Sequence, residues 1–135
     1  MATVRHRILQ QTAWLRENFA TPYPVVVEWA HKIAADPKDR PAIRESGYVG
    51  ECYWRSPVIA IRLSKRLCRT LVVAQDTLNH EWAHAIVMPN QRVHAHRVRQ
   101  GDTPEHPDEW ALAYGRIYRA WIDDGGSDEA RRLRV

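Results

Sequence analysis

Two histidines and a glutamate form an HExxH sequence, His80-Glu81-Trp82-Ala83-His84, within a stretch of helical periodicity. At about 100° per residue, a helix brings His80 and His84 to within about 40° of each other, so both imidazoles can reach one metal ion. Glu81 lies beside that face, where its carboxylate can accept a proton from a water molecule. Neutral imidazoles with an open fourth position suit zinc, so this spacing predicts metal-assisted hydrolysis.

A catalytic zinc ion needs a third protein ligand from elsewhere in the chain. The candidates by residue type are His94, His96, Glu105, His106, Asp108 and Glu109. His106 is the first choice because it precedes the last expected helix and extends the apolar stripe of that helix. Glu109 is the main rival, whereas His94 and His96 belong to a loop without an anchoring pattern. Zinc is the expected metal, although imidazole also binds iron, nickel and copper.

The elements before the motif alternate between helical and strand patterns. Residues 3–19 have the apolar spacing of an amphipathic helix, and residues 23–30 form a Val-rich strand. Residues 47–55 and 57–64 predict a β-hairpin. The segment AADPKDRPAIRESG, with two prolines and clustered charges, predicts a loop.

Two further helices are expected after the hairpin. Residues 71–88 form the helix that carries the motif, and a surface loop follows over residues 90–105. The last helix begins at Pro107 and ends before Gly125-Gly126. Its expected buried stripe comprises Trp110, Tyr114, Ile117, Tyr118 and Trp121. The predicted fold is therefore α+β, with an N-terminal helix, a small, twisted, mostly antiparallel sheet, the HExxH helix and a closing helix.

The composition limits the possible classes of protein. A chain of 135 residues fits one domain, 1–135, with a core over about residues 3–122 and a tail over 123–135. Hydrophobic residues make up 44%, and six Trp and five Tyr argue against disorder. No apolar run is long enough to span a bilayer, and no export signal is recognised. Cys52 and Cys68 lack disulfide-scaffold or zinc-knuckle spacing, so both are expected to be free thiols in the cytoplasm.

The segments NHEWAHAIV and EHPDEWALAYGRIYRAW resemble those of the SprT-like, or Spartan-type, zinc metalloproteases of the zincin group. The resemblance covers about residues 57–122. In that family a third zinc histidine lies in an H-G-P-E-[FW] sequence that opens the next helix. Here His106, Glu109 and Trp110 match it, while Pro107-Asp108 stands where the family has Gly-Pro.

The resemblance implies a minimal zincin-like domain with zinc metalloendopeptidase activity, in a short form similar to those in bacteriophage and bacterial genomes. By resemblance His80, His84 and His106 hold one Zn²⁺ per chain, and Glu81 is the general base. In zincins the strand before the HExxH helix lies at the cleft, where an extended peptide can add to the sheet edge. The substrate-binding residues expected from that strand are Val58, Ile59, Ala60 and Ile61.

The partner and the mode of action stay open at this point. Spartan-type proteases digest proteins crosslinked to DNA, and the net charge of +4 is compatible with a nucleic-acid interface. Its expected residues are Arg92, Arg97 and Arg99, with the tail arginines Arg131, Arg132 and Arg134. The alternatives are a regulatory zincin that cleaves one specific partner and a non-catalytic, metal-containing binding module. Tyr114, Tyr118 or a loop arginine could stabilise an oxyanion, and the oligomeric state is not indicated.

Overall fold

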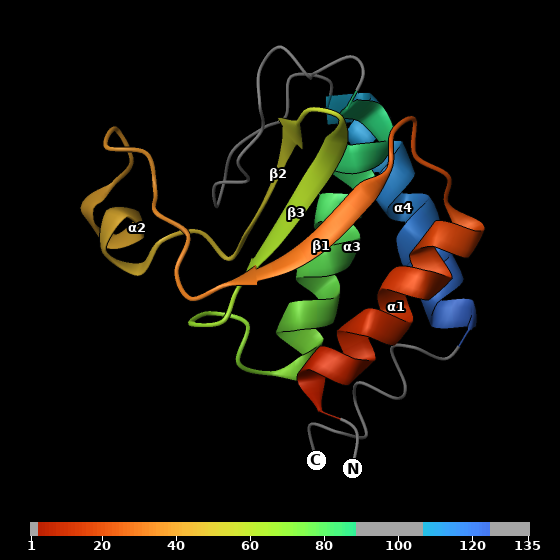
Figure 1. Cartoon of the computed structure of the whole chain (residues 1–135), viewed down its shortest axis with the longest axis horizontal. Coiled ribbons are helices and arrows are strands. Elements are labelled where there is room, and N and C mark those ends of the chain that lie inside the picture. The colour runs from red at the N-terminus through yellow and green to blue at the C-terminus, as the bar shows by residue number, and fades with distance from the viewer. Residues whose placement is uncertain (1–2, 89–106, 125–135) are drawn as a thin grey trace.

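The structure is a computed structural model that describes residues 3–88 and 107–124 (Figure 1). This part of the chain contains four helices and three strands and has the predicted α+β class. The elements are α1 (Val4–Asn18), β1 (Val25–Ala30), α2 (Pro41–Ser46), β2 (Gly50–Arg55), β3 (Val58–Ser64), α3 (Leu71–Val87) and α4 (Pro107–Asp123). No helix within these ranges combines the length and apolar character needed to cross a bilayer.

The three described strands form one sheet in the order β1-β3-β2. The predicted hairpin is confirmed, because β2 and β3 are antiparallel with Cys52 opposite Ile61. β1 pairs in parallel with the other edge of β3, with Val25 opposite Ile59. The expectation of a mostly antiparallel sheet was therefore wrong, and the sheet is mixed. The segment between β1 and β2 returns the chain so that β1 and β3 run in the same direction.

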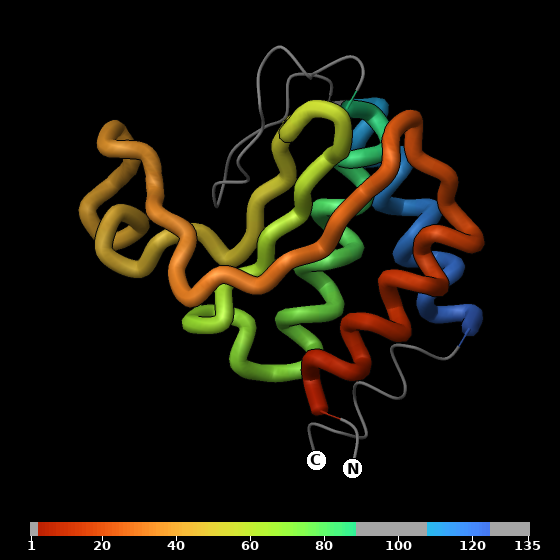
Figure 2. Tube along the Cα trace, viewed as in Figure 1, coloured from red at the N-terminus to blue at the C-terminus, as the bar shows by residue number. Residues whose placement is uncertain are grey.

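The helix α3 lies at the centre of the molecule (Figure 2). It packs against β2 and β3 on one side and contacts both α1 and α4 on others. Ile61 and Leu63 of β3 are fully buried in the same core as Leu78 and Trp82 of α3 and Leu15 of α1. The helix that carries the HExxH sequence is therefore held by every layer of the fold.

The region expected to be a loop contains the short helix α2, so this prediction was incomplete. Pro41 occupies the start of α2, where its missing N–H costs nothing. Gly47 ends the helix with a φ of 82°, and a Cβ there would approach the Ile33 carbonyl oxygen to 2.4 Å. Six residues span less than two helical turns, so no apolar periodicity could develop in the sequence.

A buried polar contact joins α1 to α3. The Gln11 side-chain amide donates to the Gln75 carbonyl at 2.9 Å and to Oδ1 of Asn79 at 2.8 Å. Nearby, the Trp82 indole donates to the Phe19 carbonyl at 3.0 Å, just past the end of α1. These bonds fix α1 against residues of α3 that lie before and within the HExxH sequence.

The closing helix α4 begins and ends close to its predicted bounds, but its buried stripe differs from the prediction. Ile117 is fully buried and Trp110, Tyr114 and Trp121 are partly buried, whereas Tyr118 is 50% exposed. Tyr118 lies about 100° around the helix from Ile117, which turns it away from the core. Ala113, which the prediction omitted, is buried instead.

Candidate metal centre

The two motif histidines lie one turn apart on α3. This helix starts at Leu71, where the Thr70 side chain accepts a hydrogen bond from the Val73 amide at 3.3 Å and so caps the N-terminus. The ring centroids of His80 and His84 are 5.2 Å apart. A tetrahedral zinc ion bonded to one nitrogen of each ring would put two such centroids roughly 5 Å apart. The spacing therefore fits two ligands of one metal ion.

Trp110, in the first turns of α4, lies against both histidines. Its ring centroid is 4.6 Å from that of His80 and 5.3 Å from that of His84, and it stacks on the His84 ring with an interplanar angle of 28°. The Trp110 indole also donates a hydrogen bond to the His80 carbonyl at 3.3 Å. One aromatic side chain therefore fixes the start of α4 on the histidine face of α3.

A second contact between the helices lies one turn further along. The Tyr114 hydroxyl donates to Oδ1 of Asp76 at 2.6 Å, and the Tyr114 ring stacks on Trp110 with an interplanar angle of 5°. Burial lowers the pKa of His80, and the nearby Asp76 opposes this shift. Burial thus favours the neutral imidazole of His80, which is the form that binds a metal ion.

Glu81 points from α3 toward the sheet. Its side chain is buried, with a relative exposure of 1%, and neither carboxylate oxygen has a hydrogen-bond partner among the described residues. Oε2 would lie 3.2 Å from a Cβ built on Gly50 in β2. Burial raises the pKa of Glu81 well above its usual value, and the charge of Glu51 raises it further. The motif carboxyl is therefore held between α3 and β2, beside the histidine face.

The other candidate metal ligands lie either outside the described residues or on the exposed start of α4. His94, His96, Glu105 and His106 lie outside the described residues. Asp108 and Glu109 are described, and both are exposed in the first turn of α4. Within residues 3–88 and 107–124, no three His, Cys, Asp or Glu side chains form a group that could hold a metal ion. The basic residues expected to contact nucleic acid, Arg92, Arg97, Arg99, Arg131, Arg132 and Arg134, also lie outside the described part.

The predicted substrate-binding strand was placed wrongly. Val58, Ile59, Ala60 and Ile61 belong to β3, which is the central strand and pairs with β1 on one side and β2 on the other. Ile59, Ala60 and Ile61 have no exposed surface. A peptide cannot add to a strand whose two edges are already bonded. The strand next to the HExxH helix in sequence is therefore not an edge of this sheet.

Three residues around the motif were missed by the sequence reasoning. Asp76 lies one turn before His80, and the i, i+4 spacing on a helix could have indicated it. Gly50 allows the Glu81 carboxyl to approach β2, but a lone glycine in a strand carries little signal. Gln11 occupies a position on the apolar face of α1 between Ile8 and Leu15, a pattern that could have predicted a buried polar contact.

The two thiols are confirmed as free cysteines, and both are buried. Burial raises the pKa of Cys52, with contributions from Glu81 and Glu51, and raises that of Cys68 to about 11. A thiol with a raised pKa contains little of the nucleophilic thiolate at neutral pH. The histidines and Glu81 therefore remain the candidate groups for chemistry in this region.

Comparison with known proteins adds no further assignment. The chain matches no family model, no curated protein and no solved structure.

Proposed function

We propose that the chain is a zinc-dependent peptidase of the SprT-like type, with His80, His84 and His106 as ligands and Glu81 as general base. The observation that carries the proposal is the buried Glu81 carboxyl beside the histidine pair. Burying a carboxyl without a hydrogen-bond partner costs about 1–3 kcal/mol, and an apolar residue would pack there at lower cost. A catalytic requirement for the carboxyl accounts for its presence.

The residues of the chain have separate tasks in this reaction. When bound, zinc would lower the pKa of a water molecule and polarise the scissile carbonyl. Glu81 accepts the proton of the attacking water and passes it to the leaving amine. Burial raises the pKa of Glu81, which makes its carboxylate a stronger proton acceptor. Trp110 and Tyr114 hold α4 against α3, which keeps the histidine rings in one orientation.

The outer edge of β2 is the surface that we propose for the substrate backbone. The inner edge of β2 pairs with β3, whereas no described strand pairs with the outer edge of β2. Gly50 in β2 lies against the Glu81 carboxyl. An extended peptide paired with β2 would therefore run beside the general base, and main-chain hydrogen bonds would provide affinity without a strict sequence preference.

Metal content measured by mass spectrometry tests the ligand set. We expect about one zinc per wild-type chain and a sharp reduction in both His84→Ala and His106→Ala. Glu109→Gln is the matched control, because Glu109 is exposed at the start of α4, and it should keep its zinc. A folded wild-type chain that holds no zinc after zinc is supplied would overturn the proposal.

Hydrolysis of an unfolded protein substrate tests the role of Glu81. Glu81→Gln should keep the zinc content of the wild type and lose activity by about 10²–10⁴-fold, as expected for removal of a general base. If the wild type binds zinc and hydrolyses neither unfolded nor DNA-bound proteins, the non-catalytic binding module becomes the better explanation. Hydrolysis of one partner only would favour the regulatory zincin.

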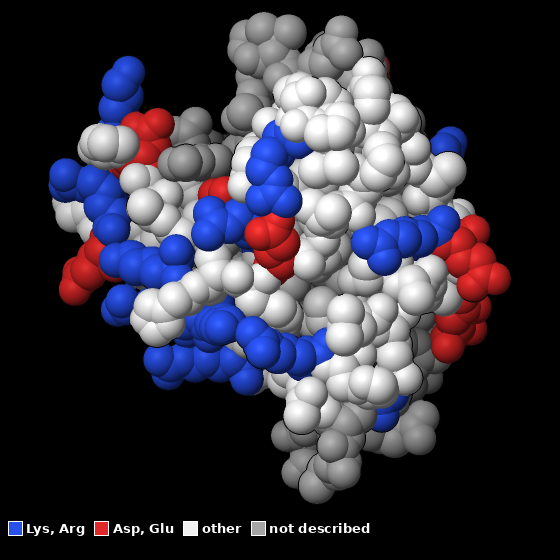
Figure 3. Space-filling view, in the orientation of Figure 1, with Lys and Arg blue, Asp and Glu red and all other residues white. Residues whose placement is uncertain are grey.

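A separate observation favours nucleic acid as a second partner. The backbone amides of Lys65 and Arg66 donate to the carbonyls of Ala30 and His31, at 2.7 and 3.1 Å, so the segments after β1 and β3 lie side by side. The exposed basic residues of these segments, which we call the basic band, are Lys32, Lys65, Arg66 and Arg69. Figure 3 shows Lys and Arg gathered at this end of the sheet. No acidic residue occurs between positions 52 and 75, so this surface suits a phosphate backbone.

Fluorescence anisotropy with labelled DNA at several salt concentrations tests this second partner. Affinity should fall steeply with salt, and Arg66→Glu with Arg69→Glu should weaken binding by about tenfold or more. Arg116→Glu, an equal charge change on the exposed face of α4, should have a smaller effect. No binding at low salt would exclude this surface as a nucleic-acid interface.

A further inference from the structure

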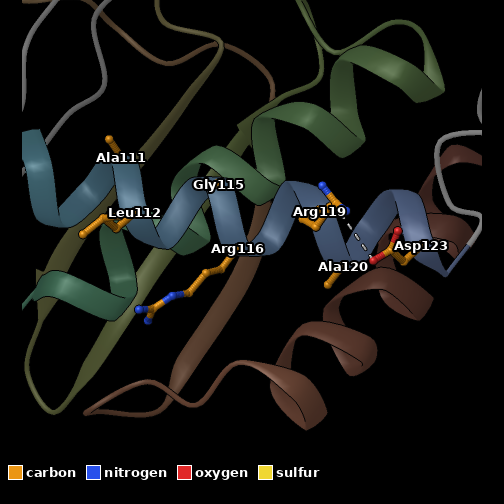
Figure 4. A pocket seen from close by; sticks show the side chains of 7 residues that line it. All are labelled: Ala111, Leu112, Gly115, Arg116, Arg119, Ala120 and Asp123. Atoms are coloured by element: carbon orange, nitrogen blue, oxygen red, sulfur yellow. Dashed lines mark ion pairs between the residues drawn. The ribbon is translucent and has the colours of Figure 1, made fainter.

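The outer face of α4 is an exposed helical surface that presents a large apolar side chain beside a glycine. The opposite face packs on α3 through Ala113 and Ile117, which are buried. On the outer face Leu112 is 64% exposed, and a Cβ on Gly115 would meet no atom within 4 Å. Leu112, Gly115 and Arg119 line a shallow hollow along the helix (Figure 4). A large apolar side chain therefore lies one turn from an open position on the same surface.

Four residues of this face form one stripe. Asp108, Leu112, Gly115 and Arg119 follow one another at spacings of four, three and four residues, which keeps them on the same side of a helix. The stripe has an acidic residue at its N-terminal end and a basic residue at its C-terminal end. Such a pattern is complementary to itself when it is read in the opposite direction.

We propose that α4 mediates a homodimer, in which a second copy of the chain lies antiparallel on this stripe. The register that brings Leu112 opposite Gly115 of the second copy also brings Asp108 opposite Arg119, because both pairs are centred between Ala113 and Tyr114. Leu112 then fills the space over the partner glycine, and two Asp108–Arg119 ion pairs close the ends. One two-fold axis satisfies the apolar and the charged contacts together.

The charges permit this arrangement without breaking a contact inside the chain. Arg119 already lies 3.7 Å from Oδ2 of Asp123, one turn further along α4, and its side chain is 83% exposed. A guanidinium has five N–H donors, so Arg119 can contact Asp123 and an Asp108 of the second copy together. Antiparallel helices also align their dipoles favourably. A single helix pair is a small interface, so a weak, concentration-dependent dimer is expected.

Sedimentation velocity over a concentration series tests the dimer with paired charge reversals. Arg119→Glu and Asp108→Arg should each weaken self-association by about tenfold or more, because each variant places like charges opposite one another at both ends. An equimolar mixture of the two variants should dimerise as the wild type does, since both ion pairs are then restored. Arg116→Glu is the control, because Arg116 faces no charge in this register.

Three outcomes would overturn the proposal. They are a wild-type chain that stays monomeric at all concentrations, a mixture that associates no better than the separate variants, and an unchanged dimer in Leu112→Asp. Circular dichroism establishes that each variant is folded, and the mixture contains both reversals, so a failure to fold cannot imitate rescue. The dimer makes no use of the histidine pair, and zinc content therefore reports separately on the proposed function.

Discussion

Glu81 combines its proposed role as general base with a cost in stability. Its carboxyl is buried between α3 and β2, and the charge of Glu51 raises the pKa further than burial alone. Structural carboxyls in protein cores usually have a cation or several donors around them. Glu81 has neither among the described residues. In the metal-free protein, Glu81 should therefore contribute less to the free energy of unfolding at neutral pH than in acid.

We expect this cost to appear as a pH-dependent difference between the metal-free wild type and Glu81→Gln. The unfolded-state pKa is near the ordinary value of 4.5, and the folded-state pKa lies well above it. The folded state therefore retains a proton that the unfolded state releases, so the contribution of Glu81 to the free energy of unfolding falls as the pH rises above about 4.5. One pKa unit corresponds to about 1.4 kcal/mol.

Urea unfolding at several pH values, in the presence of a chelator, measures this difference. The stability of the wild type relative to Glu81→Gln should decline as the pH rises above about 4.5. Glu17→Gln, an exposed carboxyl on α1, is the control and should leave the pH profile unchanged. Parallel profiles for the wild type and Glu81→Gln would contradict the burial of an unpaired carboxyl.

The sequence predicted the relative placement of those candidate residues whose relationship is local. His80, Glu81 and His84 have fixed relative directions once their segment is helical, so their spacing alone determined their arrangement. The Tyr114–Asp76 hydrogen bond joins residues 38 positions apart. No local pattern encodes that distance, because it depends on how α4 packs against α3. A third ligand for the proposed zinc ion would have the same dependence, and His106 stays a prediction.

Gly50 controls how closely α3 approaches β2. A Cβ at this position would lie 2.6 Å from Cγ2 of Thr77 and 3.2 Å from Oε2 of Glu81. We expect Gly50→Ala to push the helix from the strand and to lower the free energy of unfolding by about 1–3 kcal/mol. Thermal or urea unfolding measures the change.

Gly115→Ala is the matched control for this substitution. Within one chain its Cβ would meet open space on α4, and alanine favours a helix over glycine by up to about 1 kcal/mol. At concentrations where the chain is monomeric, the variant should therefore be as stable as the wild type or more so. Equal effects of the two substitutions would show that backbone propensity, and not close approach, determines the stability at Gly50.

Long periodic elements were predictable, and their partners were not. The apolar spacing of α1, α3 and α4 and the alternation in β3 are properties of single segments, and all four elements exist close to their predicted bounds. The order β1-β3-β2 depends on how the chain returns between β1 and β2. Periodicity contains no information on that path, which is why the central position of β3 was missed.

Gln11 connects the N-terminal helix α1 to α3, the helix that carries the histidine pair. Gln11→Ala would leave the Gln75 carbonyl and Oδ1 of Asn79 buried without this donor, at a cost of about 2–3 kcal/mol. Gln10→Ala is the control, because the neighbouring Gln10 is exposed on the same helix and should change stability little. Urea midpoints measure both, and similar values for the two variants would argue against the buried contact.

The mixed sheet also suggests an order in which the contacts of this chain form during folding. β2 and β3 are joined by a short turn, so their pairing closes a short loop. The parallel pairing of Val25 with Ile59 and the contact of Gln11 with Asn79 must close loops of 34 and 68 residues. The hairpin is therefore expected to be formed in the transition state for folding, and the helix α1 to dock after it. Changes in the hairpin should slow folding, whereas changes at Gln11 should mainly speed unfolding.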